Sequence, residues 1–236
     1  MKILTFNTAT GLYDFALDEV ETDWHTHPAM EIVLAPRGDL QLEVDHQLHT
    51  SVFFAIINAN VRHKLSCPAP VRLVMIEGSS STLEACWQEN HISLSQGIFV
   101  EQRPYNRVKW ISQLINRHEE LLPNSIMDHR IQNCLDYFSK QDIQYPEMMQ
   151  SLQARTHLSE SRLSHLFKKE MGISLKKYLV WSRLRETIQY VIADQLSLYE
   201  AGLRSGFYDQ AHLSKAFKQM LGLSPSKVYN SRTLQE

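Results

Sequence analysis

The pattern of apolar and polar residues changes character about halfway along the chain. In the first half, apolar residues alternate with polar ones, so that Leu40, Leu42 and Val44 fall on one face of a short run. Two further runs rich in β-forming residues, 52–57 and 71–76, are bounded by Asn or Pro. This half of the chain therefore predicts several short strands that pack as a small β-sandwich or barrel.

Helical spacing replaces this alternation from about Tyr105. Leu122, Pro123 and Asn124 then interrupt the helical pattern, and the rest of the chain is divided into helices by Ser, Gly and Pro. We expect an α+β fold of two domains, a β-barrel plus helix at 1–123 and an all-α domain at 124–236. The apolar residues that share the stripe of the first helix are Val108, Ile111, Leu114, Ile115 and Leu121.

One pattern occurs twice in the second half. The earlier copy is LSHLFKKEMGIS at 163–174, and the later copy is LSKAFKQMLGLS at 213–224. A shared pattern of this length indicates internal duplication of one small helical unit. The positions that agree pair Leu163 with Leu213, Ser164 with Ser214, Phe167 with Phe217, Lys168 with Lys218, Gly172 with Gly222, and Ser174 with Ser224.

Each copy predicts a helix-turn-helix. In the first, a helix over 147–155 leads through a short turn to Ser159, which can cap a second helix that Gly172 closes. The second copy repeats this plan with a helix over 198–205 and Asp209 as the cap. On the second helix of each copy, apolar residues form a buried stripe and mostly hydrogen-bonding or cationic residues point outward. The same stripe and solvated face occur in ordinary helical bundles, so one copy alone would not decide the function.

A long helix is predicted between the two copies. The segment 175–193 contains neither Gly nor Pro. A helix of this length spans about 28 Å, which is close to the roughly 34 Å between successive major-groove faces of B-DNA. Two recognition helices joined in this way could read adjacent major-groove segments on one side of the duplex.

Charge divides unevenly between the two halves. The net charge is −2, but residues 1–123 carry 9 Lys and Arg against 15 Asp and Glu, whereas residues 124–236 carry 15 against 11. The balances are therefore −6 and +4. A basic second half fits a polyanionic partner such as DNA, although the excess is modest.

Composition narrows the class of protein further. The chain is 43% hydrophobic and 21% charged, and its apolar runs are too short to span a bilayer. We find no secretory signal at the N-terminus and expect a cytoplasmic protein. Three scattered cysteines, Cys67, Cys86 and Cys134, argue against a disulfide framework and against a Cys-rich zinc site.

Residues 128–232 resemble the DNA-binding domain of AraC/XylS-type transcriptional regulators. The resemblance is carried by Gly206-Phe207-x-Asp209-Gln210 and by Phe217-Lys218-x-x-x-Gly222-x-Ser224-Pro225, in order and at the family's spacing. It implies a double-stranded DNA operator, a homodimer and, for an activator, contact with RNA polymerase. Activation is the commoner outcome in the family, and repression stays open. The chain departs from the family pattern at Gln153, where a small alanine is usual, and at Tyr199, which is commonly polar.

The resemblance also implies which side chains meet DNA. Arg162 could pair with a guanine and Gln210 with an adenine in the major groove. Lysines would instead contact phosphates and position the protein. The implied base contacts are Ser161, Arg162, Ser164 and His165 in the first copy and Gln210, Ser214 and Lys215 in the second, and the implied phosphate contacts are Lys168, Lys169, Lys176 and Lys218.

A second resemblance lies in the N-terminal half. HTHPAMEIVLAPRG at 25–38 is similar to the first motif of cupin barrels, and NANVRH at 58–63 stands where cupins carry their second motif, with Asn58 and Asn60 replacing Pro and Gly. The ligands that this resemblance suggests for a divalent metal (Zn, Fe, Mn or Ni) are His25, His27, Glu31 and His63. Because alternate side chains of a strand share a face, these residues can converge inside the barrel. His46 and His49 are expected at the surface of a hairpin turn.

Several functions fit such an N-terminal domain. The histidines could line a metal-free pocket for a small organic effector, as in many sensor domains of this family. The barrel could be a metal-dependent cupin enzyme fused to a DNA-binding domain, or it could serve only for dimerisation. We expect a sensor rather than an enzyme, because no second carboxylate or lysine stands in a convincing relation to the four residues. An effector or metal would then bias the helix near 105–122 or its contact with the DNA-binding half.

Overall fold

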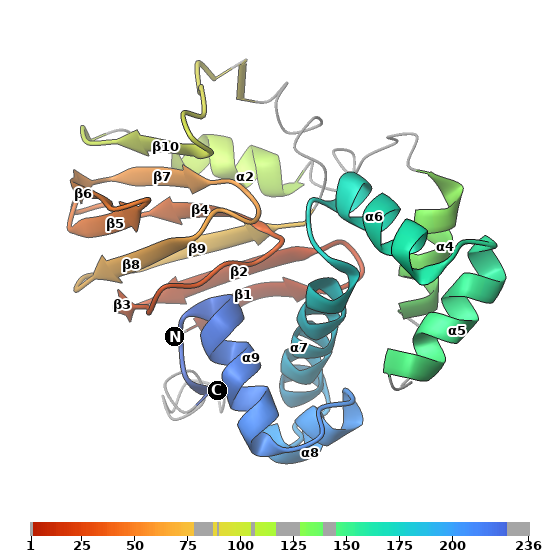
Figure 1. Ribbon diagram of the computed structural model, residues 1–236. Helices are drawn as coiled ribbons and strands as arrows, with labels where there is room; N and C mark the ends of the chain where they lie inside the picture. Colours follow the sequence, from red (N-terminus) through yellow and green to blue (C-terminus); the bar gives the residue numbers. More distant parts are fainter. Residues whose placement is uncertain are drawn as a thin grey trace. The chain divides into compact units, whose positions relative to one another are not determined.

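The protein is described from a computed structural model that places residues 2–77, 87–88, 90–104, 107–116, 128–138 and 145–225 (Figure 1). The chain divides into two compact units, and the unit Asn124–Ala216 holds the helices from α4 to α8 and the first part of α9. The boundary predicted at 123/124 lies outside the described residues and stays a prediction.

The N-terminal part consists of two antiparallel sheets. The six-stranded sheet has the order β1-β2-β9-β4-β7-β10, and the four-stranded sheet has the order β3-β8-β5-β6. The pairings β1·β2 and β5·β6 each contain a register irregularity, between Ile3 and Thr5 and between Leu40 and Leu42. The strands are β1 (Lys2–Asn7), β2 (Leu12–Leu17), β3 (Val20–Glu21), β4 (Met30–Leu34), β5 (Leu40–Val44), β6 (Gln47–Val52), β7 (Phe54–Ile57), β8 (His63–Cys67), β9 (Val71–Ile76) and β10 (Ile98–Glu101).

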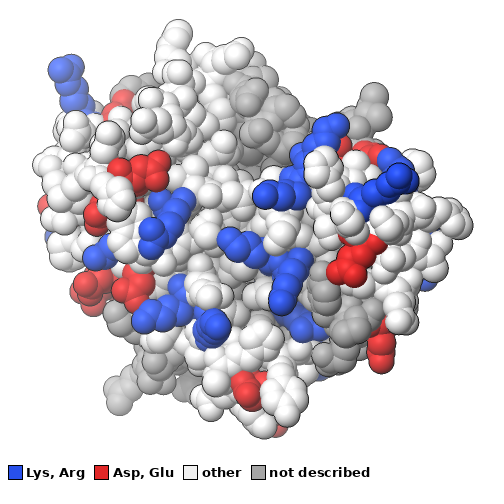
Figure 2. Space-filling model, viewed as in Figure 1, with Lys and Arg blue, Asp and Glu red and all other residues white. Residues whose placement is uncertain are grey.

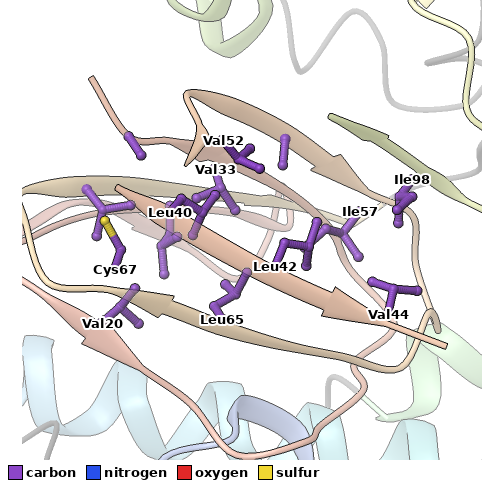
Figure 3. Close-up of a cluster of buried hydrophobic side chains, with 14 of the residues drawn as sticks. Val20, Val33, Leu40, Leu42, Val44, Val52, Ile57, Leu65, Cys67 and Ile98 are labelled. Carbon is purple, nitrogen blue, oxygen red and sulfur yellow. The ribbon is translucent and has the colours of Figure 1, made fainter. Parts of the chain in front are cut away.

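An aliphatic core fills the space between the two sheets (Figure 3). The predicted alternation of β5 is confirmed, since Leu40, Leu42 and Val44 are all buried in this core. Strand β4 does not alternate, because Val33 packs into this core while Ile32 packs into a second cluster. A strand that is covered on both faces has no solvent side, and so its sequence shows no period of two.

Helix α2 (Val108–Asn116) supplies residues to the second cluster. Ile111 and Leu114 are buried there with Ile32, Ile56 and Val74 of the six-stranded sheet. These contacts confirm the stripe predicted for Ile111 and Leu114, whereas Leu121 lies outside the described residues. The N-terminal part therefore consists of two packed sheets with a helix against one of them.

The helices of the C-terminal part follow the predicted plan. Helix α6 is capped by Ser159, whose side chain accepts a hydrogen bond from the backbone N–H of Arg162, and α7 begins and ends as the sequence predicted. Ser197 and Glu200 add a capping box to α8. The helices are α4 (His129–Phe138), α5 (Tyr145–Thr156), α6 (Glu160–Met171), α7 (Leu175–Ala193), α8 (Leu198–Arg204) and α9 (Gln210–Leu221).

Gly172 ends α6 in the left-handed conformation, with φ 68° and ψ −2°, and its N–H donates to the carbonyl of Lys168. A residue with a Cβ is strained there, so we expect Gly172→Ala to lower the free energy of unfolding by about 1–2 kcal/mol. Urea denaturation followed by circular dichroism measures this change. Gly172→Asn is the matched control and should lose less, because asparagine tolerates this conformation. Equal losses for both variants would contradict the assignment.

Candidate functional site

The structure brings His25, His27, Glu31 and His63 into one buried cluster. One ligand atom from each of the four lies within 4.8 Å of the others. All four side chains are buried. Glu31 lies on β4 of the six-stranded sheet and His63 on β8 of the four-stranded sheet. The cluster therefore joins the two sheets.

The local backbone explains why these residues meet. His25 and His63 form an antiparallel bridge in which each backbone N–H donates to the other's carbonyl, at 3.0 and 3.1 Å. This pairing sets their rings side by side, with centroids 4.1 Å apart. Glu31 is held between Ile57 of β7 and Met75 of β9. We expected His25 and His27 on the same strand as Glu31, but β4 begins only at Met30.

Each histidine ring is fixed by a backbone carbonyl. The Nδ1 atoms of His25, His27 and His63 lie 2.9, 2.8 and 3.0 Å from the carbonyl oxygens of Asp23, Ala29 and Val61, respectively. A carbonyl oxygen can only accept, so each Nδ1 carries the ring proton and each Nε2 is left with a lone pair. Histidines that bind metals are oriented in this way. Sequence reasoning missed these carbonyls, because a backbone oxygen leaves no signal in residue type.

The remaining nitrogen atoms face the carboxylate. Nε2 of His63 lies 2.9 Å from Oε2 of Glu31, and Nε2 of His27 lies 3.5 Å from the same oxygen. A carboxylate and an unprotonated Nε2 are both acceptors, so a proton or a metal ion is needed between them. The donor set of the cluster therefore fits a cation.

Burial controls the protonation of the cluster. Burial, and after it the positive charges that His63 and His27 can carry, lower the pKa of His25 to about 3. Burial alone would raise the pKa of Glu31, but the neighbouring His27 and His63 outweigh it, and the pKa of Glu31 is lowered. Near neutral pH His25 is uncharged and Glu31 is ionised. These are the protonation states in which imidazole and carboxylate bind metals.

Three imidazole nitrogens and one carboxylate oxygen could hold a metal ion. Imidazole suits Zn, Fe, Ni and Cu, and the carboxylate also suits Mn. The two histidines that were expected in a hairpin turn, His46 and His49, lie outside this cluster. His46 is exposed in the turn between β5 and β6, as predicted, whereas His49 is half-buried within β6 and not in the turn.

A second candidate surface lies on α6. Leu163 and Phe167 are fully buried in the helical core. On the remaining surface of the helix, Ser164 is half-buried and the other predicted contacts are exposed, as is Lys176 near the start of α7. Figure 2 shows Lys and Arg side chains over α6 and α7. The exposed predicted contacts on α6 are Ser161, Arg162, His165, Lys168 and Lys169.

Helix α9 repeats this arrangement. Asp209 caps it, since its carboxylate accepts from the backbone N–H of His212 at 2.7 Å. Its apolar stripe is buried, as predicted. His212 is exposed as well, and its ring contacts the buried Phe207 with centroids 5.2 Å apart. Of the predicted contacts, Gln210, Lys215 and Lys218 are exposed and Ser214 is half-buried.

Known proteins share both the helical region and the whole fold. A family described as a helix-turn-helix domain matches residues 152–231. The arabinose operon regulatory protein of Escherichia coli is 29% identical over 123 residues, which are 51% of this chain and 42% of that protein. The helical half of the chain is therefore similar to regulators of the AraC/XylS type. The probable transcriptional regulator LumQ of Photobacterium leiognathi is 24% identical over 233 residues, which are 89% of this chain and 93% of LumQ.

A solved structure shares the fold of this chain along most of its length. ToxT from Vibrio cholerae has a TM-score of 0.56 at 11% identity, and the match covers 92% of this chain and 96% of ToxT. The chain spans less than half the length of the arabinose operon regulatory proteins that it matches, 42% and 44%. Within the part of the chain that the structure describes, no helix is long and apolar enough to cross a membrane.

Proposed function

We propose that the protein is a sequence-specific DNA-binding transcriptional regulator that reads two adjacent major-groove segments with α6 and α9. The observation that carries this proposal is the duplicated helix-turn-helix unit, in which both second helices bury their apolar stripe and leave polar and cationic side chains exposed. Helix α7, with 19 residues, separates the two units. At about 28 Å it is near the length of one turn of B-DNA.

The exposed side chains divide by chemistry. Arg162 can donate two hydrogen bonds to a guanine, and Gln210 can pair with an adenine. Ser161, Ser164, His165, Ser214 and Lys215 would contact the bases beside them. The exposed lysines would neutralise phosphates and set the register of the protein on the duplex. These phosphate contacts are Lys168, Lys169, Lys176 and Lys218.

The N-terminal domain is proposed to sense an effector, and its His and Glu cluster is proposed to hold one divalent metal (Zn, Fe, Mn or Ni). Imidazole and carboxylate ligands from both sheets would bind the ion and remove the repulsion among four acceptors. An organic effector is the competing chemistry, since a ToxT structure is described as bound to an unsaturated fatty acid. The relatives named above are regulators, which favours a sensor over an enzyme.

Assembly and location complete the proposal. Two protomers would pair through the segment 105–122, which includes α2, and the homodimer would bind paired half-sites on DNA. The protein would act in the cytoplasm. If it activates transcription, it would also contact RNA polymerase. The effector would act by changing how well the two protomers occupy those sites. The DNA-binding domain is proposed to span 124–236 and the sensing domain 1–123.

Two substitutions on α6 test the assigned roles. Arg162→Ala should weaken binding by about 1–3 kcal/mol at one base position and relax the sequence preference there. Lys168→Ala should weaken all sequences alike and reduce the salt dependence by about one phosphate contact. The measurement is selection of bound duplexes from a random library, followed by titrations at several salt concentrations. An unchanged preference in Arg162→Ala would remove its role in reading bases, and the absence of any selected sequence would remove the proposed function.

A further inference from the structure

The outward faces of the two recognition helices differ in one respect that matters for reading bases. Aligning the copies on Leu163 and Leu213 places Ser161 opposite Ala211. In the first helix this position therefore carries a hydroxyl, and in the second it carries only a methyl group. The functional assignment made above for α9 leaves Ala211 without a role.

Ala211 lies in the middle of the face that α9 turns away from its own core. The buried stripe of α9 is formed by Leu213, Ala216, Phe217 and Met220. At 3.6 residues per turn, Ala211 lies about 170° around the helix from the middle of that stripe. Its side chain is exposed in the structure. Gln210 lies only about 70° from the stripe, so Ala211 and not Gln210 occupies the centre of the outward face.

The position of Ala211 along the helix also suits contact with a base. Ala211 is the second residue of α9, directly after the cap Asp209 and Gln210. The first residues of a recognition helix are those that reach base edges in the major groove. The neighbouring Tyr208 is 87% exposed. The start of α9 thus presents the methyl group of Ala211 beside the aromatic ring of Tyr208, whereas the rest of its outward face carries Lys215 and Lys218.

We propose that Ala211 reads a thymine through the 5-methyl group of that base. Thymine is the base that presents a methyl group in the major groove, and small apolar side chains discriminate it by contact. A hydroxyl at the matched Ser161 would favour polar base edges instead. The two recognition helices would therefore contact chemically different base pairs. The first would contact a polar base edge, and the second would contact a thymine. This inference rests on the proposed DNA-binding function.

The experiment uses the full chain and a duplex selected by it from a random-sequence library. Each thymine of the selected site is replaced singly by deoxyuridine, which lacks only the methyl group. One replacement on the α9 side should weaken binding about fourfold, which is the value of one buried methylene-sized group. With Ala211→Gly, the selected duplex and its deoxyuridine form should bind equally well. Ser161→Ala is the matched control and should keep the deoxyuridine effect, and circular dichroism checks that each variant is folded.

The outcomes separate this inference from the function on which it rests. If a site is selected but every deoxyuridine replacement binds as tightly as thymine, the inference is overturned and the regulator function stands. The inference also fails if the fourfold loss persists in Ala211→Gly, because another residue then reads the methyl group. If the chain selects no site at all, the inference and the proposed function fail together.

Discussion

A chain in which His25 and His63 are both replaced by alanine should retain no divalent metal, whereas the unaltered chain should bind about one ion per chain. The reason is that the double substitution removes two of the three imidazoles from a cluster whose four ligand atoms lie within 4.8 Å of one another. Elemental mass spectrometry of untagged protein measures the bound metal. Metal added at about 100 times its dissociation constant should stabilise the unaltered chain by about 2.7 kcal/mol and leave the variant unchanged.

The control for this prediction uses two histidines that lie outside the cluster. His46 is exposed in a turn, and the side chain of His129 is 86% exposed at the start of α4. A His46→Ala/His129→Ala chain should keep its metal. If the unaltered chain binds none of Zn, Fe, Mn or Ni even when they are added, the metal proposal fails. A screen of organic effectors by thermal shift would then follow.

Phe167→Ala should lower the free energy of unfolding by about 3–5 kcal/mol, since a fully buried phenylalanine is replaced by a cavity. The ring of Phe167 contacts the rings of Phe138 and Tyr178, with centroid distances of 6.1 and 5.4 Å, and thereby links α4, α6 and α7. Losing it should also weaken DNA binding, because α6 is positioned by this core. Urea denaturation of the full chain, followed by helical circular dichroism, measures the effect.

Lys168 is the neighbouring control for this substitution. Its side chain is exposed on α6, and Lys168→Ala should change stability by no more than about 0.5 kcal/mol. The two variants thus separate stability from DNA contact at adjacent positions. A loss below about 1 kcal/mol for Phe167→Ala would mean that the helical core does not depend on this ring.

The helical half could be predicted closely from the sequence because its signals are local. Ser159, Gly172 and Ser174 mark the ends of α6 and the start of α7 at the residues where the structure has them. Caps act within one turn of helix, so a single sequence is enough to place them. The duplication supplied a second copy of the same signals.

The strand half could be predicted only in outline. The strands were expected, but β9 lies between β2 and β4, although it follows both in the chain. Such pairings depend on packing between distant residues, which no local pattern encodes. The motif did suggest that His25, His27, Glu31 and His63 would converge. It did not reveal that the ligand set draws on both sheets, or that His49 lies within a strand.

The sheet edges described above bear on the solubility of the chain. Exposed strand edges attract other chains, and native proteins protect them with short strands, irregular pairing or cover. Strand β3 has two residues, and the edge strand β1 pairs irregularly with its neighbour. Strands β6 and β10 lie near each other at sheet edges. There the backbone N–H of Phe53 donates to the carbonyl of Glu101 at 2.9 Å, and the side chain of Gln102 donates to the backbone carbonyl of Thr50 at 2.7 Å. Little regular backbone is left for strand addition, so this barrel should resist edge-to-edge aggregation at the concentrations that DNA-binding experiments require.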